Sequence, residues 1–110
     1  MANRVPTISS HVLDTSRGTP AAGLTIAVSR VESDGRETEV GRGQTDADGR
    51  VADLLDRPLE AGMYRLRFVL GERSSFFAAL AVDIRVEDVG RSYHVPLLLN
   101  PFGLSTYLGS

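Results

Sequence analysis

Apolar and polar residues alternate with a period of two along most of the chain, and turn-forming residues interrupt this alternation at short intervals. The pattern predicts strands near residues 7–13, 24–32, 37–44, 51–54, 62–70, 81–87, 93–98 and 105–107. No helical period extends over about ten residues or more, and residues 73–80 have room for one helical turn at most. Short strands at this spacing are typical of an all-β sandwich.

Turn residues separate the predicted strands. Residues 14–20 read as a loop, and the Asp34-Gly35 pair within residues 33–36 predicts a hairpin turn, because glycine adopts positive φ at little cost. Residues 46–49 predict a second turn. Residues 88–90, Asp-Val-Gly, predict a hairpin that closes onto the strand at 93–98.

The segment 93–99 is apolar on both of its faces. Tyr93, Val95 and Leu97 share one face, and His94, Pro96 and Leu98 share the other. A strand with one wet face should alternate, so we expect this strand to be covered on both sides, the second cover coming from another subunit. Pro96 cannot donate to a ladder, which predicts an edge or a bulge at that point.

Composition narrows the class of protein. The 110 residues, 42% of them hydrophobic, predict one globular domain over 1–110. The chain has no cysteine, which excludes disulfides and thiol chemistry and fits a reducing compartment. The charged residues are scattered and sum to a net charge of -2, so the sequence has no basic stripe for binding nucleic acid. No apolar run approaches the roughly 20 residues of a membrane helix. With no apolar leader, we expect a cytoplasmic protein.

Few residues offer chemistry. The only histidines are His11 and His94, and a histidine on a strand is most often a half-buried residue bonded to backbone. Their spacing in the sequence does not indicate that the two histidines share a site, and it does not match a metal-binding motif. Arg50 follows an Asp-Gly turn, but all 12 basic residues are arginine, so on these grounds a solvated side chain is the simpler interpretation. The ending at Ser110, directly after a predicted strand, suggests an ordered C-terminus.

Four segments resemble the transthyretin-related 5-hydroxyisourate hydrolases, and together they run nearly from end to end. Residues 8–14 (ISSHVLD) with 17–23 (RGTPAAG) look like the opening of these enzymes. Residues 45–50 (TDADGR) resemble their Thr-Asn-x-Asp-Gly-Arg segment. Residues 93–103 (YHVPLLLNPFG) are similar to their His-Tyr-His-Val-Pro-Leu-Leu-Leu-Ser-Pro stretch, and 107–110 (YLGS) to their terminal Tyr-Arg-Gly-Ser.

The resemblance implies a transthyretin-like two-sheet sandwich of about eight strands. It implies a homotetramer, a dimer of dimers with sites at the dimer–dimer interface, and no metal or organic cofactor. The implied reaction opens 5-hydroxyisourate, a small purine-derived intermediate of urate degradation, to 2-oxo-4-hydroxy-4-carboxy-5-ureidoimidazoline. The matching catalytic residues are His11, Arg50, His94 and Ser110, with substrate binding by Arg50, Tyr107, Gly109 and Ser110. One histidine would be the general base and the other an orienting donor, and the resemblance leaves their order open.

The sequence also departs from the family pattern. Leu108 replaces an arginine, Ser92 a histidine and Asp46 an asparagine, and the short 69–75 segment predicts that the usual short helix is reduced or absent. Two alternatives therefore stay open. One is a diverged hydrolase or cyclase acting on a related cyclic amide, and the other is a non-enzymatic small-ligand binding module of the transthyretin type. Retention of both histidines argues against the binding module, because true transthyretins replace them.

Overall fold

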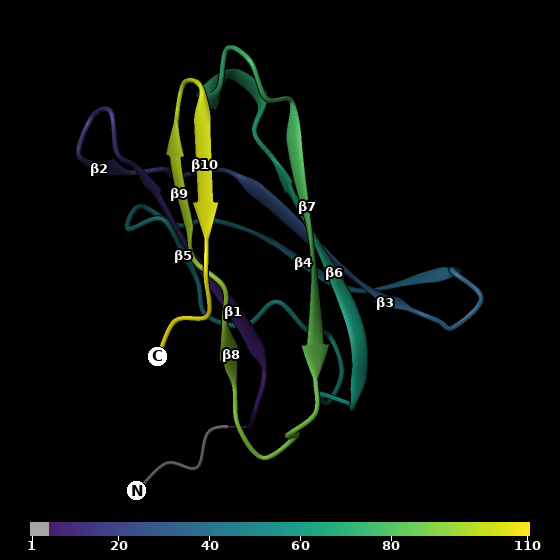
Figure 1. Cartoon of the computed structure of the whole chain (residues 1–110). Coiled ribbons are helices and arrows are strands. Elements are labelled where there is room, and N and C mark those ends of the chain that lie inside the picture. Colours follow the sequence, from purple (N-terminus) through teal and green to yellow (C-terminus); the bar gives the residue numbers. More distant parts are fainter. Residues whose placement is uncertain (1–4) are drawn as a thin grey trace, which may run out of the picture.

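The computed structural model describes residues 5–110 and shows two β-sheets packed face to face (Figure 1). One sheet has the order β10-β9-β1-β2, with β5 and β8 also paired to β1. Its strands are β1 (Ile8–Asp14), β2 (Thr19–Pro20), β5 (Arg50–Val51), β8 (Tyr93–His94), β9 (Leu97–Asn100) and β10 (Gly103–Thr106). The other sheet has the order β4-β3-β6-β7, from β3 (Thr25–Val31), β4 (Glu37–Gln44), β6 (Gly62–Val69) and β7 (Ala79–Val86).

Strict alternation along β1 separates the core from the outer face. Ile8, Ser10 and Val12 are buried between the sheets, while the intervening side chains of Ser9 and His11 point to the outer face and are half-buried. Side chains from both sheets fill the core, among them Ile26, Val28, Tyr64, Leu66, Phe68, Leu97 and Leu99. The alternation therefore fixes which residues of β1 can reach a ligand from outside.

The predicted all-β sandwich is confirmed, and so is the expectation that the short helix is reduced or absent. Between β6 and β7 the chain makes one 3-10 turn, η1 (Gly71–Arg73). The hairpin at residues 33–36 joins β3 to β4, with Gly35 at φ +88°. Within the described part of the chain, no helix has the length and apolar character to cross a membrane.

Two predictions about the C-terminal third are wrong. Residues 88–90 do not close a hairpin, because β8 pairs with β1 in parallel, so this connection crosses from one sheet to the other. The predicted strand 93–98 is two strands, β8 and β9, separated at Val95 and Pro96. The break fits a proline that cannot donate to the ladder.

The strand predicted at 51–54 shortens to β5, and β2 is an additional strand within the predicted loop 14–20.

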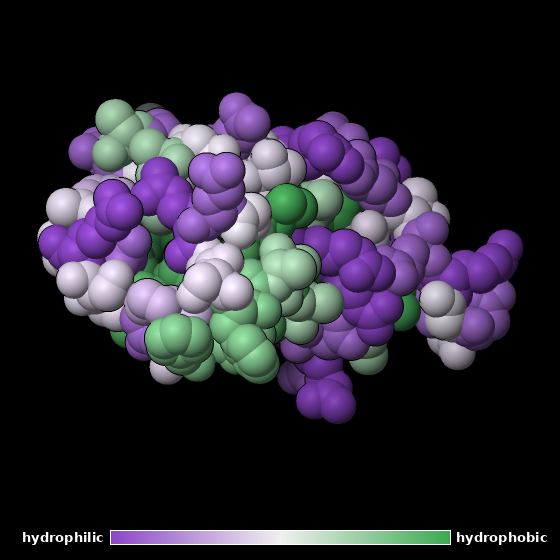
Figure 2. Space-filling model, turned by 90° about the horizontal axis from the view of Figure 1, so that it is seen from above, coloured by the Kyte–Doolittle hydropathy of each residue, from purple (hydrophilic) through white to green (hydrophobic). Residues whose placement is uncertain are grey.

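One end of the sandwich carries an exposed hydrophobic patch (Figure 2). Phe76, in the β6–β7 connection, is 70% exposed, and Phe102, in the β9–β10 turn, is 75% exposed. The Ser74 hydroxyl donates to the Pro101 carbonyl at 3.1 Å and ties the two segments together. The shortened connection therefore shapes the rim of the sandwich.

Candidate functional site

Strand pairing brings three of the expected residues onto one patch of the outer face. Arg50 of β5 lies opposite His11 of β1. His94 of β8 lies opposite Ser9 of β1, two residues before His11 on the same face. Gly109 then pairs with His94 in an isolated antiparallel bridge. Residues far apart in sequence thus meet because β1 is the common neighbour of β5 and β8.

The turn before β5 places Arg50 and also holds His11. One carboxylate oxygen of Asp46 accepts the backbone N–H groups of Asp48 and Arg50, each at 2.9 Å. Gly49 lies between these two residues and has φ +77°. A Cβ at this position would lie 2.4 Å from the Val12 carbonyl oxygen, so the turn needs glycine. The Asp48 carbonyl then lies 2.9 Å from Nε2 of His11. The Asp46 carboxylate therefore forms this turn.

Hydrogen bonding assigns the ring nitrogens of His11. A carbonyl oxygen only accepts, so Nε2 must carry the proton that it donates to Asp48. In the neutral ring, Nδ1 of His11 is then the bare nitrogen. Arg50, on the neighbouring strand, is exposed and takes part in no ion pair among residues 5–110. This cation is thus available to an anionic ligand.

The His94 imidazole is half-buried. Burial lowers the pKa of His94 below its usual 6.5, and the positive charge of Arg50, followed by that of His11, lowers it further. Its Nδ1 lies 2.8 Å from the Ser9 hydroxyl oxygen. A histidine held neutral in this way can accept a proton near neutral pH.

The C-terminal tail packs directly on His94, as the expected ordered end requires. The Gly109 N–H donates to the His94 carbonyl at 2.8 Å. A Cβ on Gly109 would lie 2.7 Å from Cδ2 of His94 and 3.2 Å from Cγ of Pro96. The tail therefore covers part of the outer face at Pro96, and it carries exposed Ser110 to the edge of the site.

Tyr107 and Leu108 line a different surface. They border an apolar groove of about 330 Å³ together with Val82 and Ile84 of β7 and with the inward-facing Val95. Leu108 is 59% exposed there. Ser92 also has a local role, since its hydroxyl accepts the Thr7 N–H at 3.0 Å.

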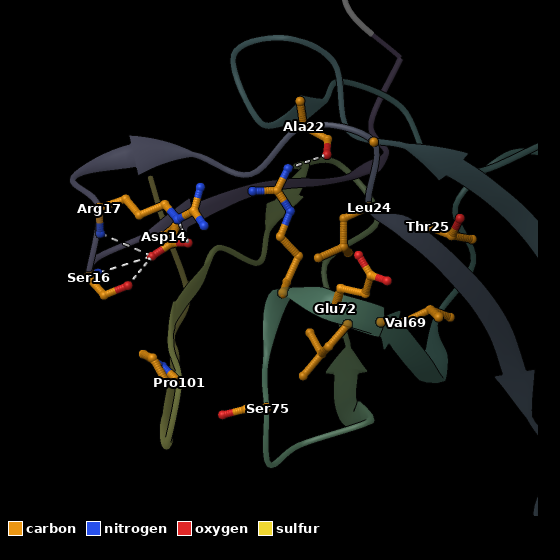
Figure 3. A pocket seen from close by; sticks show the side chains of 14 residues that line it. Asp14, Ser16, Arg17, Ala22, Leu24, Thr25, Val69, Glu72, Ser75 and Pro101 are labelled. Carbon is orange, nitrogen blue, oxygen red and sulfur yellow. Dashed lines mark hydrogen bonds and ion pairs between the residues drawn. The ribbon is translucent and has the colours of Figure 1, made fainter.

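A hollow of about 810 Å³ lies beside the η1 turn, away from both histidines (Figure 3). Three of its four charged residues, Asp14, Arg17 and Arg73, are engaged with their neighbours. The Ser16 hydroxyl donates to Asp14 at 2.7 Å and lowers the pKa of that carboxyl, and Arg73 donates to the Ala22 carbonyl at 2.8 Å. None of the expected site residues lines this hollow. We therefore place the candidate site at the histidines.

Sequence reasoning missed two partners of the histidines, Ser9 and the Asp48 carbonyl. Ser9 lies two residues before His11 on the same strand, so the alternation of the strand could have placed it on the same face as His11. Its contact with His94 depends on the pairing of β1 with β8, which no local pattern gives. The Asp48 carbonyl is backbone and leaves no trace in the residue types.

This arrangement of two imidazoles, an arginine and a packed tail on a two-sheet sandwich defines a class of protein: the chain belongs to the HIUase/Transthyretin family, whose model matches residues 8–109. It is 37% identical to a 5-hydroxyisourate hydrolase of Caulobacter vibrioides, over 94% of this chain and 97% of that one. It is 41% identical to that of Deinococcus radiodurans, over 96% and 97%.

Solved structures agree on the fold. The 5-hydroxyisourate hydrolase of Klebsiella pneumoniae superposes with a TM-score of 0.80 at 38% identity, over 94% of this chain and 99% of that one. Transthyretin from Sparus aurata superposes with a TM-score of 0.86 at 30% identity, over 96% and 97%. The expected family membership is confirmed.

Proposed function

We propose that this protein is a 5-hydroxyisourate hydrolase that opens its substrate to 2-oxo-4-hydroxy-4-carboxy-5-ureidoimidazoline in urate degradation. The observation that carries the proposal is the cluster of His11, Arg50 and His94 on one face of β1, β5 and β8. The near full-length similarity to hydrolases of that name supports the substrate. A chain without cysteine fits the cytoplasm as the proposed location.

His94 is the general base in this proposal. Its lowered pKa keeps the ring neutral near pH 7, and Nδ1 is already engaged with Ser9, so Nε2 is the nitrogen left to take a proton. Water attacks the ring carbonyl while its proton passes to Nε2. The tetrahedral oxyanion then collapses, the ring C–N bond breaks, and the imidazolium returns the proton to the departing nitrogen.

Arg50 supplies the fixed positive charge. Its guanidinium stays protonated throughout, and it binds the anionic substrate and the developing oxyanion. His11, held by the Asp48 carbonyl, orients the substrate. Gly109, which the tail brings to His94, and its neighbour Ser110 border the bound ring. Tyr107, proposed from the resemblance to bind substrate, lines the separate groove beside β7.

We also propose that four copies assemble as a dimer of dimers, with the sites at the dimer–dimer interface. The outer face beside the histidines is suited to such a contact, because Leu13 and Leu98 lie opposite each other there and are only half-buried. A facing copy would cover them and enclose the site.

The direct test generates 5-hydroxyisourate with urate oxidase and follows the decay of its ultraviolet absorbance with and without the protein. We expect the protein to accelerate the decay. A rate equal to the spontaneous one would reject the proposal.

One observation favours a second candidate, a diverged hydrolase or cyclase of a related cyclic amide. Leu108 stands where the family carries an arginine and lies in an apolar groove. The variant Leu108→Arg separates the two candidates. A rate on 5-hydroxyisourate within about threefold of the parent favours the primary proposal, whereas a gain of about tenfold or more favours the diverged one.

A further inference from the structure

Ser9 contacts a proposed catalytic group without belonging to the expected site. It lies on β1, half-buried on the outer face, opposite His94 in the parallel pairing of β1 with β8. Its hydroxyl oxygen is 2.8 Å from Nδ1 of His94. The next residue, Ser10, points to the core and donates to the Val95 carbonyl at 2.7 Å, so the two adjacent hydroxyls serve opposite faces of the strand.

The ring nitrogens of the two histidines have different partners. In His11, Nε2 is occupied as the donor to the Asp48 carbonyl. In His94, Nδ1 is occupied by Ser9, and no group among residues 5–110 hydrogen-bonds to Nε2. A neutral imidazole carries one proton, and the hydrogen bond made at one nitrogen decides where that proton sits. A serine hydroxyl can donate or accept, so the distance fits either tautomer.

We propose that Ser9 is a positioning residue, whose hydroxyl oxygen accepts the Nδ1–H of neutral His94 and so leaves Nε2 bare for the substrate water. The inference rests on the proposed function, because only a bare Nε2 can take the proton in that reaction. When Nε2 becomes protonated, the Nδ1–H bond to Ser9 becomes charge-assisted and strengthens. On the other edge of the ring, Gly109 packs against Cδ2, so the imidazole is held between Ser9 and the tail.

The test reads the tautomer directly by ¹⁵N NMR of the imidazoles at a pH where both rings are neutral. With two histidines in the chain, a His11→Gln variant assigns the signals. We compare the parent with Ser9→Ala, with Ser9→Thr, which keeps the hydroxyl, and with Ser29→Ala as a matched control. Ser29 is another half-buried strand serine, on the other sheet, and its hydroxyl takes part in none of the side-chain hydrogen bonds of residues 5–110.

We expect the Nδ1–H tautomer of His94 in the parent and in Ser9→Thr, and a shift toward Nε2–H in Ser9→Ala. In the same series, kcat should fall about tenfold in Ser9→Ala with KM changed less than about twofold, and Ser9→Thr should recover most of the rate. Ser29→Ala should match the parent in both measurements.

An Nε2–H tautomer in the parent, or unchanged ¹⁵N shifts in Ser9→Ala, would overturn the role of Ser9. The NMR measurement needs no substrate, so it stands apart from the hydrolase assay. A parent that holds the Nδ1–H tautomer but does not accelerate 5-hydroxyisourate decay would overturn the proposed function and keep the Ser9 contact.

Discussion

At the scale of single residues, the two histidines differ in what surrounds their rings. His94 is enclosed between Ser9 and Gly109, and burial together with the charge of Arg50 lowers its pKa. His11 is tied to a backbone carbonyl in the turn before Arg50. The same residue type therefore has two environments on one sheet face, which is how a proton acceptor and an orienting group can be distinguished.

Removing the imidazole of His94 should lower kcat by about 10² or more, the scale of a lost general base. The measurement is the rate of 5-hydroxyisourate decay with His94→Ala. Tyr93→Phe is the control, because the Tyr93 hydroxyl bonds only to the backbone of Asp88 and should matter little to the rate. A His94→Ala variant with the parent rate would show that the base is another group.

The activity should have an acid limb governed by His94. Protonation removes the base, and the pKa of His94 is lowered, so the rate should rise with pH through a value below 6.5. Arg50→Gln removes a repelling cation and should raise the pKa of His94, as followed by NMR titration of its ring protons. Arg42→Gln, in an ion pair with Glu39 on the other sheet, should leave that pKa unchanged. An unmoved His94 pKa in Arg50→Gln would contradict the assigned electrostatics.

At the scale of elements, the segment after β5 ties Arg50 to both sheets. The Leu54 N–H donates to the Ile8 carbonyl of β1, and the Asp56 N–H donates to the Val40 carbonyl of β4. This crossing requires Gly41 on β4, where a Cβ would lie 1.6 Å from the Leu54 carbonyl oxygen. The position of Arg50 thus depends on a close backbone approach some distance from the site.

Gly41→Ala should therefore destabilise the fold by about 3 kcal/mol, because the obstacle is backbone that cannot move aside. Gly43→Ala is the matched control on the same strand. Its Cβ would approach a methyl group of Val51 at 2.9 Å, and a side chain can give way. Urea unfolding of both variants gives the comparison, and equal losses would contradict the close approach.

At the scale of the whole molecule, the site lies on an open sheet face. Leu13 and Leu98 are half-buried beside it, and Gly109 of the tail packs on the face at His94 and Pro96. Half-buried leucines around a site of this kind are what a facing copy of the chain would cover. Assembly and activity are therefore expected to be coupled.

Light scattering should give a mass about four times the 11.9 kDa of one chain. Leu98→Arg places a charge on the expected contact face and should lower that mass toward that of a dimer or a single chain, and it should reduce the hydrolase rate by about tenfold. Val89→Arg, in the exposed 87–92 connection, is the control and should change neither. A parent that scatters as a monomer would remove the proposed assembly.

The sequence by itself determined the strand-rich class and the family, and it supplied the candidate site residues. It could do so because alternation follows directly from which side of a strand faces the core, and because the motifs around His11, Arg50 and His94 are local. The hairpin at Asp34-Gly35 followed for the same reason, since turn chemistry is a local property.

Only the tertiary structure decided how these pieces meet. The turn at 88–90 looks locally like a hairpin, yet β8 joins β1 in the opposite sheet, because pairing depends on burial across the whole sandwich. The same long-range pairing sets Ser9 against His94, and the 46–49 turn sets the Asp48 carbonyl against His11. These contacts join segments 85 and 37 residues apart, and they set the surroundings of one nitrogen in each imidazole ring.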